Sequence, residues 1–293
     1  MIFRTCALCD YPAELYPELA ESMGEWLRTA RDAYGAEIAH VSFNEADIGV
    51  KEGRVVLIGQ GLPAAEREID AAGRVVTPGG VDGHCHLDQP MAPPVRMADD
   101  FDSGTRAAAC GGTTTVIPFA AQRKGESLRA AVDDYHRRAR DRAHVDYAFH
   151  LIVSDPTPTV LNDELPALID EGYTSFKVYM TYDDLKLDDG QVLDVLEVAR
   201  RHGAMAMIHA ENSDCIEWLT RRLEQAGRTA PRFHGTSRPM LVEREATHRA
   251  ISLAELVDVP ILVVHVSGRE AVEQIRWARG HGLSVFAETC PQY

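Results

Sequence analysis

Residues 75–90 read VVTPGGVDGHCHLDQP, and this stretch decides the fold that we expect. A short apolar run passes through a Pro-Gly-Gly turn and ends in His84-Cys85-His86. Side chains on an extended segment alternate between two faces, so His84 and His86 point to the same side. Neutral imidazole is a common zinc ligand, and such a pair supplies two ligands of an ion. One pair among 12 histidines is a weak signal by itself, because surface or core histidines explain it equally well.

A repeating alternation of apolar runs and helical patterns follows this stretch. The runs have the length of buried parallel strands and lie at residues 114–119, 145–153, 174–180, 204–210, 261–267 and 284–290. Apolar residues spaced three and four apart predict helices around residues 128–135, 192–199, 246–257 and 271–278. Together with the strand before His84, the pattern predicts seven strands of a (β/α)8-type barrel, which needs eight. We therefore expect an α/β fold, an incomplete TIM-type barrel over residues 77–293.

The residues before the barrel divide into two parts. Residues 1–40 show no alternation of strand-like and turn-like segments, and residues 14–34 have a helix-like pattern. We leave residues 1–40 unassigned. Residues 41–76 contain strand-like runs at 55–58 and 74–76, separated by glycines. They predict a partial small β domain of the sandwich type.

Composition excludes several classes of protein. The formal net charge is −15 and no Lys/Arg run is longer than a pair, which argues against nucleic acid or an anionic membrane surface as partner. No apolar run approaches the roughly 18 residues of a membrane span, and the N-terminus does not resemble a signal peptide. We expect a cytoplasmic enzyme with reduced thiols, and no function for the Cys6-x-x-Cys9 pair.

Polar residues lie on several of the expected barrel strands. His84 and His86 end the first strand, Lys177 lies in the fourth, His209 ends the fifth and His265 ends the sixth. Each has an ordinary explanation when taken singly, such as a hydrogen-bonded core histidine or a lysine that reaches solvent. Their joint placement is different, because parallel barrels keep their catalytic residues at the carboxyl ends of the strands. The pattern predicts a functional site there.

Six segments resemble the successive signatures of one family. They are GGVDGHCHLDQP, ACGGTTTVIPF, GYTSFKVYMTYDD, MIHAEN, VVHVSG and AETCPQY, and the resemblance around them covers residues 46–293. They look like cyclic amidohydrolases of the dihydropyrimidinase and hydantoinase type, in the amidohydrolase superfamily. The resemblance implies hydrolysis of a dihydropyrimidine or a 5-substituted hydantoin to an N-carbamoyl amino acid. Allantoinase and dihydroorotase are relatives with similar ligands. Tyr182 in FKVYMTYDD favours the dihydropyrimidinase and hydantoinase type over these two.

The resemblance also implies a metal centre. Lys177 would react with carbon dioxide to give a carbamate (N6-carboxylysine), an anion that bridges two divalent ions. His84 and His86 would hold the first ion, and His209 and His265 the second. Zinc is the first choice, and manganese and cobalt accept the same ligands. A hydroxide between two such ions is a strong nucleophile near neutral pH and would attack a ring carbonyl.

Two further residues receive roles from the resemblance. The Tyr182 phenol would donate a hydrogen bond to the oxyanion that develops on the substrate; the alternative is an aromatic side chain that only covers the site. Asp88 and the loop through residue 97, together with loop 179–186, would wall the substrate pocket.

The family pattern also implies features that these residues lack. A complete enzyme has an aspartate on an eighth strand, which would fall beyond Tyr293, so we expect a C-terminally truncated chain whose own activity is open. Family members commonly form homotetramers, which suggests a homo-oligomer. The alternative from another class is a non-catalytic scaffold of the same fold, and the presence of all five ligand positions speaks against it.

Overall fold

The computed structural model describes residues 2–7, 45–71, 76–91, 94–290 and 293. The chain divides into two compact units, Met1–Gly79 and Gly80–Tyr293, and each is described here by itself. All of the candidate site residues belong to the second unit.

The first unit contains a four-stranded sheet in the order β3-β2-β1-β4. Its strands are β1 (Ile2–Ala7), β2 (Glu45–Lys51), β3 (Arg54–Gly59) and β4 (Glu68–Asp70). Glu52 and Gly53 join β2 to β3, and both have the positive φ that a tight two-residue hairpin turn requires. Strand β1 lies in the segment that the sequence left unassigned. The helix-like pattern at 14–34 and Cys9 fall outside the described residues.

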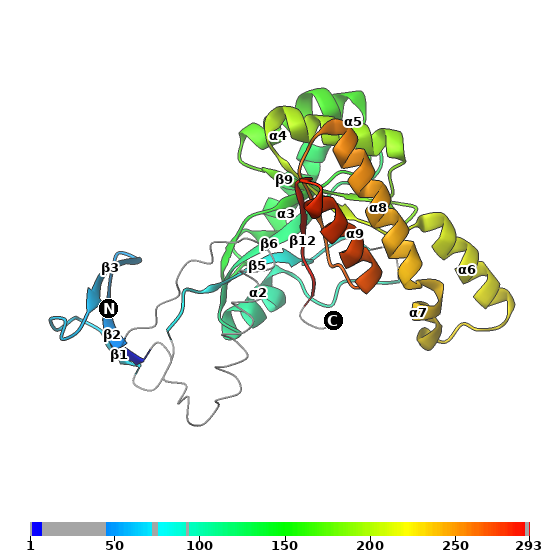
Figure 1. Ribbon diagram of the computed structural model, residues 1–293. Helices are drawn as coiled ribbons and strands as arrows, with labels where there is room; N and C mark the ends of the chain where they lie inside the picture. The colour runs from blue at the N-terminus through cyan, green and yellow to red at the C-terminus, as the bar shows by residue number, and fades with distance from the viewer. Residues whose placement is uncertain (1, 8–44, 72–75, 92–93, 291–292) are drawn as a thin grey trace. The chain divides into compact units, whose positions relative to one another are not determined.

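The second unit is built on a curled parallel sheet in the order β12-β11-β10-β9-β8-β6-β5 (Figure 1). Its strands are β5 (Gly80–Cys85), β6 (Thr113–Ala121), β8 (His150–Ile152), β9 (Ser175–Tyr179), β10 (Met205–His209), β11 (Ile261–Val263) and β12 (Val285–Ala287). The short β7 (Asp146–Tyr147) pairs with β6 beside β8. Seven parallel strands thus form part of a barrel, which confirms the expected incomplete α/β barrel.

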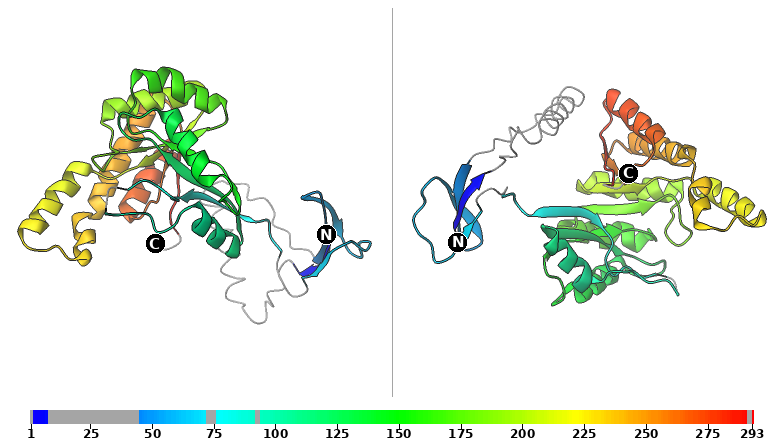
Figure 2. Two further views of the ribbon diagram at one scale, coloured as in Figure 1. Left: turned by 180° about the vertical axis from the view of Figure 1, so that it is seen from behind. Right: turned by 90° about the horizontal axis from the view of Figure 1, so that it is seen from below.

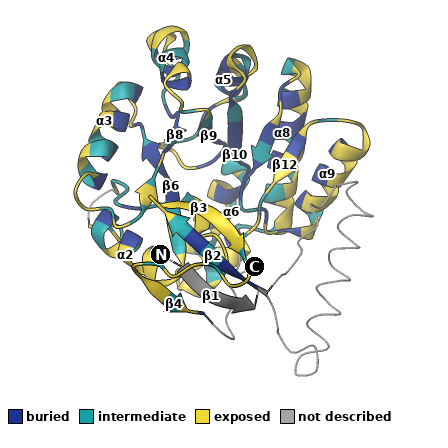
Figure 3. Cartoon of the chain, turned by 90° about the vertical axis from the view of Figure 1, so that its left-hand side faces the viewer, coloured by how far each residue is buried: buried dark blue, intermediate teal, exposed yellow. Residues whose placement is uncertain are grey.

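Helices flank this sheet, and most of them cover its outer side (Figures 2 and 3). They are α2 (Phe101–Cys110), α3 (Leu128–Ala139), α4 (Leu165–Asp170), α5 (Asp189–His202), α6 (Ser213–Gln225), α7 (His234–Ser237), α8 (Met240–Val257) and α9 (Arg269–Gly280). Single-turn elements, Val160–Glu164 and Pro231–Phe233, precede α4 and α7. Helices α3, α5, α8 and α9 occupy the positions expected from the sequence. No helix in the described part of the chain has the length and apolar character needed to cross a membrane.

Two of the expected strands are shorter or more broken than their apolar runs. The run at 145–153 forms β7 and β8, and the interruption lies opposite Ile117 and Pro118 of β6. Pro118 has no N–H to donate to a ladder. The run at 261–267 forms a strand only as far as Val263, so His265 lies two residues beyond β11 rather than at its end.

Alternation along the strands creates two apolar cores. Phe176 and Val178 of β9 belong to the large core between the sheet and the helices. Tyr179 belongs to a smaller cluster on the inner face, with Phe119, Ile152, Met207 and Val264. Because strand side chains alternate, Lys177 shares the inner face with Tyr179.

Candidate active site

Lys177 lies at the centre of the candidate site. Its side chain is only 1% exposed, and its Nζ atom lies over the rings of Phe119 and Tyr179, 4.6 and 5.0 Å from their centroids. Nζ is also 3.0 Å from Nε2 of His84. Burial lowers the pKa of Lys177 to about 7, although the negative charge of Glu288 opposes this shift. A large share of this amine is therefore neutral near pH 7.

Four histidines surround the lysine. The ring of His84 lies 5.6 Å from that of His86 and 5.5 Å from that of His265, measured between centroids. The rings of His265 and His209 are 4.5 Å apart. The structure thus brings together all five residues that the sequence singles out as ligands, from β5, β9, β10 and the segment after β11.

Three of these imidazoles have one ring nitrogen engaged by a side-chain acceptor. His84 donates from Nδ1 to Glu288, and His86 donates from Nδ1 to the amide oxygen of Gln89. His209 donates from Nε2 to the carboxylate of Glu211, at 2.8 Å. Metal-binding histidines typically donate their second nitrogen in this way, which fixes the ring and leaves the other nitrogen for the ion.

The sequence reasoning missed the three acceptors. Gln89, Glu211 and Glu288 all stand inside the quoted motifs, in HLDQP, MIHAEN and AETCPQY. Gln89 and Glu211 lie within three residues of a predicted ligand, which was the available signal, whereas Glu288 has no predicted ligand near it in the sequence. This signal did not show which histidine each acceptor would reach.

The electrostatics of the cluster favour neutral imidazoles. Burial lowers the pKa of His86 to about 4, and the charge of Lys177 adds to the effect. Burial also lowers the pKa of His265 to about 3 and shifts the pKa of His209 downward. Neutral imidazole has the free lone pair that a metal ion requires.

Within the described residues, no three His, Cys, Asp or Glu side chains are arranged to hold an ion by themselves. The cluster offers an ion two histidine pairs and one lysine as ligands. An ion held here by three or more protein ligands would need a ligand from Lys177 as well.

Tyr182 follows β9 and faces the same cluster. Its ring lies 5.2 Å from the ring of His209, edge to face, and the residue is 43% exposed. Its backbone has a φ of 68°, a left-handed conformation that is uncommon outside glycine and that is found often at functional sites. Burial and the charge of Glu211 raise the pKa of the Tyr182 phenol, which stays a hydrogen-bond donor at neutral pH.

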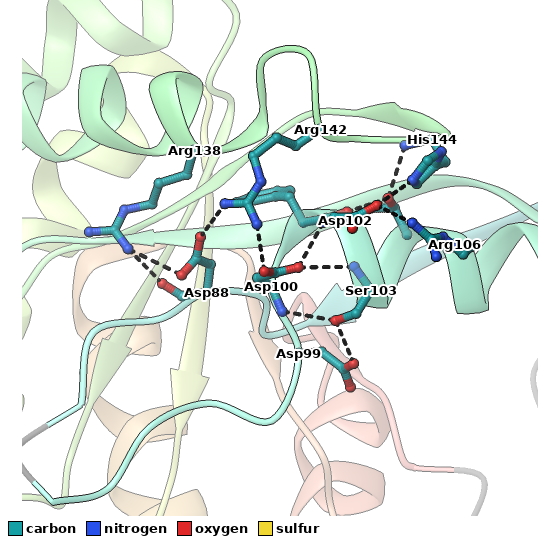
Figure 4. Close-up of polar contacts among 11 residues, drawn as sticks. Asp88, Asp99, Asp100, Asp102, Ser103, Arg106, Arg138, Arg142 and His144 are labelled. Carbon is teal, nitrogen blue, oxygen red and sulfur yellow. Dashed lines mark hydrogen bonds and ion pairs between the residues drawn. The ribbon is translucent and has the colours of Figure 1, made fainter.

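Asp88 lies in a network of ion pairs with two arginines (Figure 4). Its carboxylate forms ion pairs with Arg138, at 3.3 Å, and with Arg142, at 3.7 Å. The role of Asp88 as a substrate contact stays a prediction.

A pocket of about 620 Å³ lies beside this ion-pair network. It is lined by Asp88, Gln89, Pro90, Met91, Val95, Arg96, Met97, Ala98, Asp99, Asp100, Ser103 and Arg138. The five candidate ligand residues and loop 179–186 do not contribute to this lining.

Comparisons with known proteins agree with this geometry. The model of the Amidohydrolase family matches residues 75–241. The chain is 48% identical over 255 residues to a D-hydantoinase of Streptomyces coelicolor, covering 85% of this chain and 54% of the relative. It is 47% identical over 262 residues to a D-hydantoinase of Geobacillus stearothermophilus, covering 88% and 55%.

The chain is also similar to a protein of known structure. The crystal structure of a dihydropyrimidinase from Brevibacillus agri superposes with a TM-score of 0.83 at 43% identity, covering 86% of this chain and 55% of the other. The chain thus spans about half the length of the curated relatives that it matches.

Proposed function

Because the chain belongs to the amidohydrolase family, we propose that it carries the metal-binding and oxyanion-binding part of a cyclic amidohydrolase. The reaction is ring opening of a 5-substituted hydantoin or a dihydropyrimidine to an N-carbamoyl amino acid. The observation that carries the proposal is the buried amine of Lys177 inside a cluster of four histidines, 3.0 Å from the nearest of them.

The donor set fits two divalent ions. His84 and His86 would hold one ion, and His209 and His265 the other. Each pair supplies two nitrogens, whereas a zinc site uses three or four protein ligands. A carbamate on Lys177 would add one oxygen ligand to each ion. The low pKa of Lys177 supports this modification, since only a neutral amine reacts with carbon dioxide.

Two ions in this position would lower the pKa of a water molecule and polarise the ring carbonyl. The chain's own residues prepare the site for that chemistry. Glu288, Gln89 and Glu211 hold three imidazoles by their second nitrogens. Tyr182, protonated at neutral pH, donates a hydrogen bond to the carbonyl oxygen as negative charge develops on it.

The names of the relatives support this substrate class. D-hydantoinases and a dihydropyrimidinase are among the most similar proteins, which favours these rings over those of allantoinase or dihydroorotase. The proposal further includes zinc as the first metal, with manganese or cobalt as alternatives, a homo-oligomeric assembly and a cytoplasmic location. The family resemblance supports the assembly, and the acidic composition supports the location.

The test compares the 293-residue chain with a chimera that joins it to the C-terminal part of the S. coelicolor relative. We expect the chimera to bind about two ions per chain and to hydrolyse dihydrouracil or a 5-substituted hydantoin. A matched chimera with Lys177→Met should do neither. A well-folded chimera that binds no metal and has no activity would instead favour a non-catalytic scaffold.

A further inference from the structure

A loop leaves the candidate site two residues after His86 and is closed at its base. The backbone N–H of Asp88 donates to the carbonyl of Asp99, at 3.0 Å, so the chain returns to its starting point across residues 88–99. Asp100 then begins helix α2, because its carboxylate accepts hydrogen bonds from the backbone N–H groups of Asp102 and Ser103. The segment 88–100 is therefore anchored at both ends.

Two arginines join these anchors, Arg138 in the last turn of α3 and Arg142 in the segment after it (Figure 4). Arg142 forms ion pairs with both Asp88 and Asp100, and so connects the beginning of the loop to its end. Arg138 donates to the backbone carbonyl of Asp88, at 3.1 Å, and to its carboxylate, at 3.3 Å. Asp134 holds Arg138 from the other side, at 2.6 Å.

Both oxygens of the Asp88 carboxylate take part in this network. Its Oδ1 atom faces Arg138 and its Oδ2 atom faces Arg142. Asp88 has a φ of 51°, a left-handed conformation that turns the chain sharply after the strand. A carboxylate whose two oxygens each face a guanidinium group is poorly placed to bind a substrate as well.

Gln89, the residue after Asp88, contacts one of the candidate metal ligands. Gln89 accepts a hydrogen bond from Nδ1 of His86. The position of Asp88 therefore sets the position of the group that orients His86.

We propose that Asp88 is a positioning residue rather than a contact for the substrate. Together with Arg138 and Arg142, it keeps loop 88–100 closed at its base and holds Gln89 against His86. This inference deepens the proposed function, and only its kinetic readout rests on that function.

A protease test reads the loop directly, without metal or substrate. Arg96 is exposed and is the only Lys or Arg between residues 89 and 99, so trypsin cleavage after Arg96 reports how often the loop opens. Asp88→Asn removes the charge and keeps a residue that tolerates a left-handed backbone. Arg142→Gln removes the other partner. The control is Arg129→Gln in the first turn of α3, which removes an exposed ion pair with Glu171.

We expect Asp88→Asn and Arg142→Gln each to speed cleavage after Arg96 by roughly three- to tenfold, as befits half-exposed ion pairs. In the double variant, the cleavage rate should rise by much less than the product of the two single effects, because both substitutions disrupt the same network. Arg142→Lys should restore most of the protection, and Arg129→Gln should behave as wild type. Cleavage at the wild-type rate in both single variants, or effects that multiply, would overturn the proposal.

The kinetic readout uses the active chimera. Positioning predicts that Asp88→Asn and Arg142→Gln lower kcat to a similar degree and leave KM almost unchanged. A raised KM in Asp88→Asn alone, with unchanged proteolysis, would identify a substrate contact and overturn the proposal. If the wild-type chimera has no activity, the proposed function fails, and the proteolysis experiment still decides the role of Asp88.

Discussion

The Nζ atom of Lys177 lies 3.0 Å from Nε2 of His84, although 93 residues separate the two along the chain. His84 donates from its other nitrogen to Glu288, so its Nε2 atom has a free lone pair that accepts from the lysine amine. The same lone pair is the one that a metal ion would use.

Removing the lysine should therefore remove the metal. Lys177→Met keeps an unbranched buried side chain and deletes the amine, and we expect the ion content of the chimera to fall from about two to near zero per chain. Lys51→Met, at an exposed position of β2, is the control. Elemental analysis after gel filtration measures the result, and two ions retained in Lys177→Met would contradict the carbamate ligand.

Carbon dioxide uptake should depend on pH through this amine. The lowered pKa means that Lys177 is protonated and unreactive below about pH 7, and becomes a free nucleophile as the pH rises through that value. Carbon-13 NMR of metal-free protein in labelled bicarbonate should show a carbamate signal that grows across this range and is absent from Lys177→Met. A midpoint near the ordinary lysine pKa of about 10.4 would show that burial does not activate the amine.

Loss of the carboxylate beside His84 should weaken metal binding. In Glu288→Gln the imidazole loses its negatively charged acceptor, and we expect metal affinity to fall about tenfold, at the lower end of such effects. Competition with a chelator measures the affinity. Glu270→Gln, which breaks a surface pair with Arg244, should leave it unchanged. An equal loss of metal affinity in both variants would attribute the effect to the net charge of the protein rather than to the hydrogen bond of His84.

Removing the phenol hydroxyl of Tyr182 should lower the turnover rate and leave the metal content unchanged. Tyr182→Phe should lower kcat of the chimera by about 10²- to 10³-fold, the usual cost of one oxyanion donor. Metal content should stay at the wild-type level, because the ring still packs on His209. Unchanged kcat would reduce Tyr182 to an aromatic cover of the site.

A side chain at Gly104 of helix α2 should destabilise the protein. A Cβ there would clash with Leu87, the residue after His86, so Gly104→Ala should destabilise the fold by about 1–3 kcal/mol. At Gly280, the last residue of α9, a Cβ meets open space, and Gly280→Ala should be neutral or slightly stabilising. Urea unfolding compares the two variants, and equal stability would show that Leu87 moves aside freely.

The parts of this fold that the sequence predicts are those that local pattern determines. Buried parallel strands are continuous apolar runs, so β6, β9 and β10 could be located, and alternation along β9 places Lys177 inward. Helix α6 was missed although Ile216, Leu219 and Leu223 have helical spacing, and of these only Ile216 is buried. Strand β1 was missed because its partner β2 lies far along the chain.

The same distinction applies to the site. The ligand candidates could be named from residue type and position on strands. Their acceptors could not, because the pair of His84 and Glu288 spans 204 residues and depends on how β5 and β12 are placed in the sheet. The ion pairs of Asp88 with Arg138 and Arg142 depend on tertiary packing in the same way.

The hydrogen bonds to the second imidazole nitrogens have a thermodynamic consequence. The fold itself orients His84, His86 and His209, so the rotational freedom of these rings is lost when the chain folds and not when ions arrive. Ions should then enter and leave without reorienting these three rings. Which metal occupies the site follows from ligand chemistry and from the supply of ions around the protein, and little from movement of the imidazoles.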